Sequence, residues 1–373
     1  MIKKNSATSF SHRFIGIELL RWVSAIGILF WHYQHFFYTK AIHGDDFQDY
    51  ESMPLYSILH PIYMNGAKGV QLFWAISGFV IFHKYGLSII KISSFAKNRM
   101  ARLYPLHLLT LFLVASLQLF STFLFKENQI YFENSLKNFL LHFLFISGWE
   151  SSPSLSFNQP VWSVSLEIIV YAFFVLLLLI KAFRQNPKWL WPTILVGTFV
   201  LVNFNEIHGV FNCILFFSLG ATLRCFLDQL GNMATFVSTI ILFITLLDKY
   251  LLKNYLENFG GDNEINSNLI LLFQISALIV ISINLDRMAF IQLRREGIQV
   301  LGNLTYGTYL LHVPFQIFLL LIVKEIGLPV ITLAQNPFSL MVYLLAVNFL
   351  AFYTYRHIEL PCNRQLKNFK FRP

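Results

Sequence analysis

Charged residues are scarce in this chain of 373 residues. Only 13% of its residues are Asp, Glu, Lys or Arg, whereas 56% are hydrophobic and 17% are aromatic. A soluble globular protein carries about 25% charged residues, so this chain lacks the polar surface needed to face water on all sides. The composition therefore excludes a soluble protein and predicts an all-α fold, a polytopic bundle of transmembrane helices.

Cysteines and cofactor motifs are also scarce. The three cysteines, Cys213, Cys225 and Cys362, lack the spacing of a metal site, and we interpret them as packing residues without a disulfide. The chain contains no Walker loop, GxGxxG, HExxH or GxSxG motif. We therefore expect no metal and no bound cofactor. We expect no nucleic-acid partner either, because membrane topology and attraction to anionic lipid account for the net charge of +9.

Long apolar stretches dominate the rest of the sequence. A stretch of about 17–25 such residues can span a bilayer as a helix. The stretch 136–149 is shorter and fits an interfacial or re-entrant helix. No signal peptide precedes the first span and no repeat or soluble domain is visible, so we predict one membrane domain, residues 1–373. The ten predicted spans lie near 14–38, 66–85, 103–125, 160–181, 189–205, 208–227, 233–251, 267–285, 302–324 and 338–357.

Basic residues set the direction of these spans. With ten spans and a cytoplasmic N-terminus, every arginine except Arg21 falls on the inner side, while acids collect in the outer loops. Making 136–149 an eleventh span would move the basic segment 181–188 outside, against the positive-inside rule. We therefore predict a multi-pass protein of the cytoplasmic (inner) membrane with both termini in the cytoplasm.

Two ionisable residues lie inside the first predicted span. Arg21 and His32 are eleven positions apart, about three helical turns, so their side chains share one face at a separation of about 16 Å. Ionisable groups at this depth are costly and mark functional sites. The alternative is a packing histidine hydrogen-bonded to a neighbouring helix, with Arg21 reaching toward the inner boundary beside Glu18. The shared face favours function.

Two further motifs carry charge. The segment Trp162–Glu167 opens the fourth span and places Glu167 at the depth of His32. A carboxylate there would fix the tautomer of a basic imidazole. The alternative is a structural glutamate. Arg99 and Arg102 share a helix face at the inner mouth of the third span. Such a pair can bind phosphate or carboxylate, although juxtamembrane arginines are more often membrane anchors.

Small and polar residues mark two other spans. Ala75, Ser77 and Gly78 in the second span favour close helix packing, with Ser77 able to hydrogen-bond to a neighbour. The segment Leu301–His312 places a second histidine near the middle of the membrane, close to Tyr309. His312 is either a satisfied core residue or part of a polar cavity, and the residues alone leave both open.

In this order, the five motifs resemble the integral-membrane acyltransferase family 3, bacterial O-acyltransferases of envelope and exported carbohydrates. That family has an arginine, ten residues and a histidine, then FFxxSGF, RxxR, W-S-x-S-x-E and LGxxSYxxYLxH motifs. Glu18, Trp74 and Thr305 are mild departures from its usual Asp, Phe and Ser. The matching segments here are Arg21 and His32, Phe73–Phe79, Arg99 and Arg102 with Pro105, Trp162–Glu167 and Leu301–His312, followed by an E-x-P-like Glu359–Pro361.

The resemblance implies an enzyme that moves an acyl group, with acetyl as the expected group, from cytoplasmic acyl-CoA to a hydroxyl of a carbohydrate. Acyl-CoA is then a co-substrate, and the acceptor belongs to O-antigen, capsule, exopolysaccharide or another lipid-linked glycan. Membrane lipid is a further partner, and the oligomeric state stays open. The implied catalytic residues are His32, Glu167 and Arg21, and the implied substrate-binding residues are Arg99, Arg102, Ser77, Trp162, Tyr309 and His312.

Two further expectations concern the outer side and the competing function. Acidic outer loops are common in membrane proteins, but some of the outer residues also suit carbohydrate contact: Asp45, Asp46, Tyr50, Trp149 and Trp162. The alternative function is a proton-coupled transporter or flippase of a glycan or anion, in which the buried Arg, His and Glu conduct protons or bind an anion. That interpretation leaves the arginine pair and the order of the motifs unexplained, and no discontinuous-helix pair in matching halves supports it.

Overall fold

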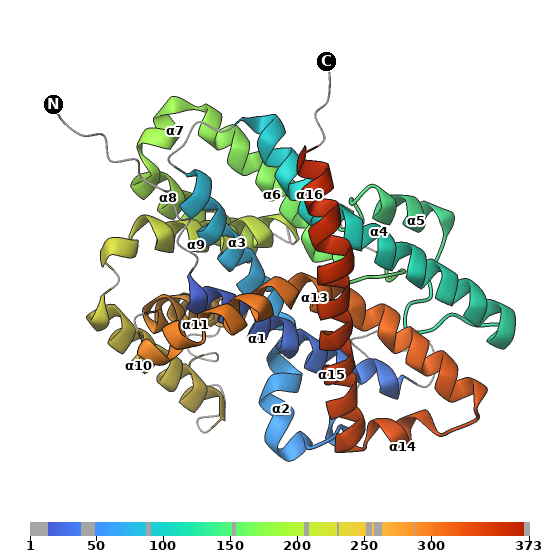
Figure 1. Cartoon of the computed structure of the whole chain (residues 1–373). Helices are drawn as coiled ribbons and strands as arrows, with labels where there is room; N and C mark the ends of the chain where they lie inside the picture. The colour runs from blue at the N-terminus through green and yellow to red at the C-terminus, as the bar shows by residue number, and fades with distance from the viewer. Residues whose placement is uncertain are drawn as a thin grey trace.

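The computed structural model describes residues 14–38, 49–86, 91–150, 154–204, 209–229, 231–250, 256, 263–286 and 288–368. Every regular element in these ranges is a helix (Figure 1). The elements are α1 (Ile15–His32), η1 (Tyr33–Phe37), η3 (Tyr50–Ser52), α2 (Tyr56–Asn65), η4 (Gly66–Lys68), α3 (Gly69–Tyr85), α4 (Ile92–Phe125), α5 (Leu136–Phe143), α6 (Val161–Leu179), α7 (Lys181–Gln185), α8 (Pro187–Phe204), α9 (Val210–Cys225), η5 (Leu227–Gln229), α10 (Asn232–Tyr250), α11 (Asn263–Leu285), α12 (Ala289–Leu293), α13 (Arg295–Glu325), α14 (Val330–Ala334), α15 (Pro337–Thr354), the π-helix η7 (Tyr355–Glu359) and α16 (Leu360–Asn368).

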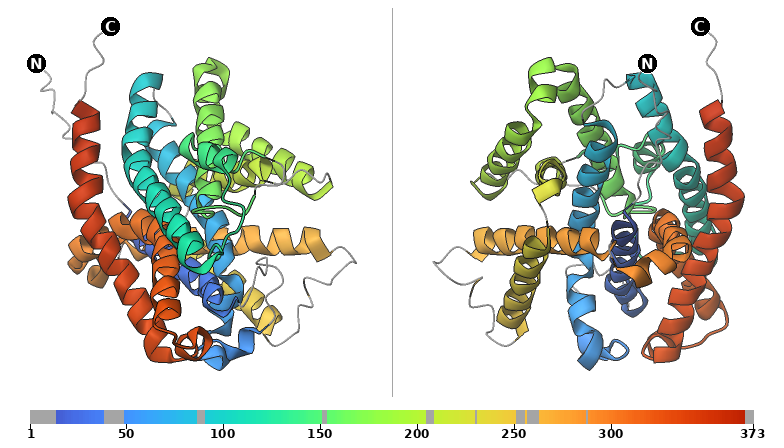
Figure 2. Two further views of the ribbon diagram at one scale, coloured as in Figure 1. Left: turned by 90° about the vertical axis from the view of Figure 1, so that its right-hand side faces the viewer. Right: turned by 60° about the vertical axis from the view of Figure 1, so that its left-hand side comes forward.

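Helices α1 and α13 form the centre of the bundle. Helix α1 packs against α13, α11 and α3, and α13 also packs against α4 and α15. Helices α7 and α16 lie at one end of the bundle, and α2 and α14 lie at the other (Figures 1 and 2). Residues far apart in the sequence are therefore brought together around α1 and α13.

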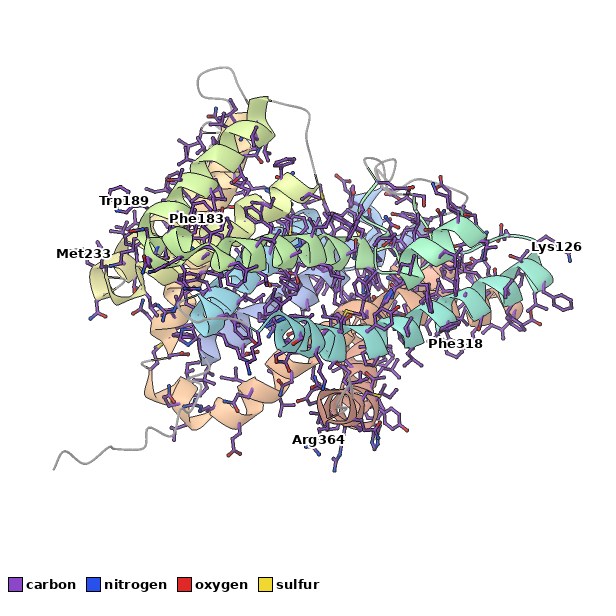
Figure 3. All side chains as sticks on the ribbon, turned by 90° about the horizontal axis from the view of Figure 1, so that it is seen from above. Lys126, Phe183, Trp189, Met233, Phe318 and Arg364 are labelled. Atoms are coloured by element: carbon purple, nitrogen blue, oxygen red, sulfur yellow. The ribbon has the colours of Figure 1, made fainter. Side chains whose placement is uncertain are left out.

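The outer surface of the bundle is apolar. Trp189, Met233 and Phe318 point outward from α8, α10 and α13 (Figure 3), and 80%, 74% and 46% of their surfaces are exposed. Large exposed apolar areas are unusual on a soluble monomer. A bilayer would cover this surface, as the composition predicts.

The predicted spans all coincide with helices, but not all of these helices are long. Within the described ranges, seven helices are long and apolar enough to cross a membrane. Helices α3 and α9 have only 17 and 16 residues, and α8 is not among the seven. The all-helical membrane fold is confirmed, whereas the count of ten spans and the cytoplasmic termini stay predictions.

Two helices differ in length from the apolar stretches that predicted them, 103–125 and 136–149. Helix α4 begins at Ile92 rather than near residue 103 and has 34 residues, so Arg99 and Arg102 lie within a continuous helix about 51 Å long. Within 136–149 the helix α5 has only eight residues, about 12 Å, which is too short to span a bilayer. That segment is not an eleventh helical span.

The small residues of the second predicted span pack as expected. A Cβ atom added to Gly78 would collide with the backbone of Phe217 on α9, and one added to Gly220 would collide with the backbone of Ala75 on α3. Helices α3 and α9 therefore approach at backbone contact, as small residues permit between membrane helices. This close packing confirms the interpretation of Ala75 and Gly78 as packing residues.

We expect Gly78→Ala to destabilise the protein by about 1–3 kcal/mol, because overpacking a close interface forces backbone shifts. The measurement is the thermal unfolding midpoint in detergent. The matched control is Gly197→Ala on α8, where an added Cβ meets nothing within 4 Å and where alanine is the better helix former. Equal stability of Gly78→Ala and wild type would contradict the backbone contact.

Candidate active site

A polar cavity of about 110 Å³ lies between α1, α3, α4, α6 and α13. Its apolar walls include Phe73, Trp74 and Leu103. Each of the five ordered motifs contributes at least one residue to it. The polar residues around it are Arg21, Ser77, Arg99, Arg102, Ser163, Glu167, Tyr171, Thr305, Tyr306 and Tyr309.

Three arginines line this cavity with a single glutamate. Arg21 Nη1 donates to Glu18 Oε2 at 3.1 Å, one turn earlier on α1. Arg99 lies over the rings of Tyr171 and Phe95, with distances of 5.4 and 5.6 Å from its guanidinium carbon to the ring centroids. Cation–π contact of this kind holds a guanidinium in place without neutralising it.

Part of this positive charge lacks a hydrogen-bond acceptor. Arg99 Nε is buried and has no partner among the described residues, and in the same ranges neither Arg99 nor Arg102 is within ion-pair distance of a carboxylate. An unmatched buried donor is costly unless a ligand completes it. A guanidinium is the preferred group for phosphate and carboxylate, so the cavity is suited to an anion.

Glu167 faces these arginines. Tyr171 Oη donates to Glu167 Oε2 at 2.5 Å, and Ser77 Oγ lies 3.1 Å from the same hydroxyl. The Glu167 carboxylate also interacts electrostatically with Arg99, Arg102 and Arg21. Glu167 is therefore part of the cavity's charge balance.

The predicted pairing of Glu167 with His32 is wrong for the described structure. Neither side chain hydrogen-bonds to the other, and His32 does not line the polar cavity. The prediction used depth along the span alone. Glu167 lies in the cavity of Arg21, which is about three helical turns along α1 from His32, so the predicted depth itself was inaccurate. Helix α6 presents Glu167 to the arginines of α1 and α4.

His32 lies instead in a cluster of three histidines at the end of α1. Its ring centroid is 4.6 Å from that of His312 and 5.0 Å from that of His35. Gln316 links the cluster, because its Nε2 donates to the carbonyl of His32 at 2.9 Å and its Oε1 lies 2.9 Å from His35 Nδ1. We call His32, His35 and His312 the histidine cluster.

His35 and Gln316 were not predicted as site residues, although each had a signal in its spacing. His35 is three residues after His32, and Gln316 is four after His312. Residues at these spacings share a helix face. Tyr171 was missed in the same way, because it lies four residues after Glu167.

The partners of the three histidines determine their tautomers. His32 Nδ1 lies 3.0 Å from the carbonyl of Ile28, and His312 Nδ1 lies 2.6 Å from the carbonyl of Tyr309. Because a carbonyl oxygen only accepts, Nδ1 carries the proton of each neutral imidazole, and each Nε2 then keeps a lone pair. The Oε1 of Gln316 has the same effect on His35. The backbone thus does for His32 what Glu167 was predicted to do.

Tyr309 connects the polar cavity to the histidine cluster. Its side chain lines the cavity. Its hydroxyl donates to Pro160 O at 2.6 Å and lies 2.8 Å from Ser163 Oγ. Its carbonyl accepts from His312, whose Nε2 is buried without a partner in the described part of the chain. One turn of α13 therefore separates the arginine-lined cavity from three basic nitrogens.

The residues predicted to contact carbohydrate on the outer side are gathered less closely than those of the polar cavity. Trp162 is not in the wall of the polar cavity and packs on Trp74 with ring centroids 5.8 Å apart. Tyr50 Oη donates to Gln34 Oε1 at 3.2 Å, and Trp149 Nε1 donates to Ser165 O at 3.0 Å. Asp45 and Asp46 lie outside the described residues. Among the residues that are described, no group of three or more His, Cys, Asp or Glu could hold a metal ion.

Comparison with known proteins assigns the family. Residues 14–356 match the family model described as an acyltransferase domain. The chain belongs to this acyltransferase family. It is also similar to the acyltransferase MdmB of Streptomyces mycarofaciens, with 29% identity over 161 residues, which are 42% of this chain and 37% of that relative's length. No solved structure matches the chain.

Proposed function

We propose that this protein is a membrane O-acyltransferase that moves an acyl group from acyl-CoA to a hydroxyl of a surface or lipid-linked carbohydrate. The expected acyl group is acetyl. One observation carries the proposal. A cavity with three arginines, one of them with an unpartnered buried donor, lies one helical turn from three histidines with unprotonated Nε2 atoms. Membership in the acyltransferase family agrees with it.

The polar cavity is the donor site in this proposal. Arg99 and Arg102 bind phosphate groups of acyl-CoA, and Glu167 with Tyr171 holds the arginines in place. The acyl arm extends past Arg21 toward Tyr309. Arg21 lines the cavity while His32 does not, which favours a role for Arg21 in holding the arm over one in stabilising the developing oxyanion.

The histidine cluster supplies the base. His32 Nε2 takes the proton of the acceptor hydroxyl as its oxygen attacks the thioester carbonyl. The C–S bond then breaks, and the leaving thiolate takes the proton from the imidazolium, so that ester and free CoA are formed. A base within hydrogen-bond reach of such a hydroxyl typically contributes about 10²–10⁴-fold to the rate.

The acceptor and the location complete the proposal. The name of the relative in Streptomyces mycarofaciens specifies acyl transfer and no acceptor, so the carbohydrate rests on the resemblance of the motifs. The apolar surface of the bundle supports a multi-pass membrane protein, and the cytoplasmic membrane gives the arginines access to acyl-CoA.

Binding and slow hydrolysis of acetyl-CoA test the proposal without knowledge of the acceptor. We expect the purified protein in detergent to bind acetyl-CoA in calorimetry and to release CoA thiol slowly. Absence of binding would contradict the donor. Flux of a glycan or anion through proteoliposomes without any acyl product would instead indicate the transporter.

A further inference from the structure

A second cavity, which we call the apolar cavity, lies beside the histidine cluster. It has a volume of about 250 Å³ and lies between η1, α13, α14 and α15. Apart from Ser339 and the hydroxyls of Tyr33 and Tyr343, the side chains around it are hydrocarbon. An apolar cavity of about 150 Å³ in another protein takes up benzene rather than water. Its chemistry therefore selects a hydrocarbon occupant.

The apolar cavity and the histidine cluster lie on adjacent faces of the same chain segment, residues 32–36. A 3₁₀-helix has three residues per turn, so residues three apart lie in one column. His32 and His35 form the column that faces the histidine cluster, and Tyr33 and Phe36 form the next column, which faces the apolar cavity. Tyr33 and Phe36 in the wall of the apolar cavity are thus rotated by about 120° around the helix axis from His32 and His35.

Helix α13 repeats this arrangement. His312 and Gln316 are four apart and contact the histidine cluster, whereas Phe315 and Leu319 are four apart and line the apolar cavity. Two separate elements therefore turn one face to the basic nitrogens and the adjacent face to the apolar cavity. A molecule that fills the apolar cavity lies next to the proposed base.

One polar group in the wall of the apolar cavity is incomplete. Tyr343 is 2% exposed, and its ring packs on Tyr33 and Phe36 with centroids 5.6 and 5.5 Å away. Its hydroxyl has no hydrogen-bond partner among the described residues. By contrast, the hydroxyl of Tyr33 donates to Ala334 O at 2.9 Å. A buried hydroxyl without a partner is destabilising, and a hydrogen bond to a ligand oxygen would remove this cost.

We propose that the apolar cavity binds the hydrocarbon chain of the acyl acceptor's lipid anchor. The first oxygen of the anchor's head group accepts a hydrogen bond from Tyr343, and the attached head group reaches the histidine cluster. Phe338 and Val342 at the edge are 64% and 46% exposed, so the cavity meets the lipid-facing surface. This inference rests on the proposed function and narrows its acceptor to membrane-anchored molecules rather than released polysaccharide.

Filling the apolar cavity tests the proposal. Ser339→Trp places an indole where the chain would lie, and Val342→Trp is a second filling variant at a more exposed position. Leu345→Trp is the matched control, because Leu345 is on the same helix, is 63% exposed and is not in the cavity wall. The probe is a hexadecyl alcohol with a diazirine group, and cross-linked peptides are identified by mass spectrometry.

In wild type and Leu345→Trp we expect the probe to label mainly peptides from the segment 315–343. Both filling variants should lose most of this label. In membranes supplied with radiolabelled acetyl-CoA, wild type and Leu345→Trp should produce label that extracts into organic solvent. The filling variants should produce several-fold less, while their retained binding of acetyl-CoA reports a folded donor site.

Two results would overturn the inference. Label spread evenly over the outer helices of wild type would mean that no chain-binding site exists. Loss of label without loss of acyl transfer would mean that the apolar cavity holds an ordinary bilayer lipid. Failure of wild type to bind acetyl-CoA would refute the proposed function instead, and the cross-linking would still report on the cavity.

Discussion

Replacing His32 with alanine is expected to slow acyl transfer by about 10²–10⁴-fold, the usual contribution of a general base. The reason is geometric, since the carbonyl of Ile28 holds the Nδ1 proton and leaves Nε2 as a base beside His312. The measurement is release of CoA thiol at saturating acetyl-CoA, compared between His32→Ala and wild type.

Donor binding separates loss of chemistry from loss of folding in this experiment. His32 does not line the polar cavity, so His32→Ala should bind acetyl-CoA as wild type does. The matched control is His357→Ala, which changes an exposed histidine on η7 and should keep full turnover. Thiol release by His32→Ala at the wild-type rate would contradict the role of His32 as the base.

Replacing Arg102 with alanine is expected to weaken acetyl-CoA binding by about 10–100-fold, because a hydrogen bond to a charged group contributes about 1.5–3 kcal/mol. Arg102 lines the polar cavity and has no ion pair to lose within the described ranges. At saturating acetyl-CoA the rate should fall much less, since the change affects donor binding. Calorimetry and the dependence of rate on acetyl-CoA concentration measure the two effects.

Acetyl-pantetheine, which lacks the phosphates of CoA, sharpens this test. If Arg102 binds phosphate, wild type and Arg102→Ala should bind acetyl-pantetheine equally, and the difference between them should appear only with acetyl-CoA. Arg364→Ala on α16, outside the polar cavity, is the matched control. Equal weakening with both donors would mean that Arg102 supports the cavity without contacting phosphate.

Much of the polar cavity could be predicted from short motifs. Arg21, Ser77, Arg99, Arg102 and Tyr309 were all expected at a site and all line the polar cavity. Arg21 was visible because an ionisable side chain inside an apolar helix is costly and therefore selective. The site roles of Ser77, Arg99, Arg102 and Tyr309 came from the resemblance of their motifs to the acyltransferase family. The packing residues of α3 were distinguished from the site residues because small side chains in a membrane helix permit close helix packing.

The partners of these residues were harder to predict. Glu167 was expected beside His32 and lies with the arginines, while the tautomer of His32 is set by a backbone carbonyl of its own helix. Neither the link through Gln316 nor the apolar cavity has a motif. These features depend on pairs of helices that are far apart in the sequence.

The sequence by itself determined that this protein is an all-helical membrane protein, approximately where its apolar helices lie and which polar residues they carry. Length and hydropathy are local properties, and they give the depth of each residue along its helix. Only the tertiary structure decided which residues meet, because contact also requires the rotation of each helix and the identity of its neighbours. Packing of whole helix faces sets both, so His32 and Glu167, which the predicted span boundaries place at one depth, belong to different sites.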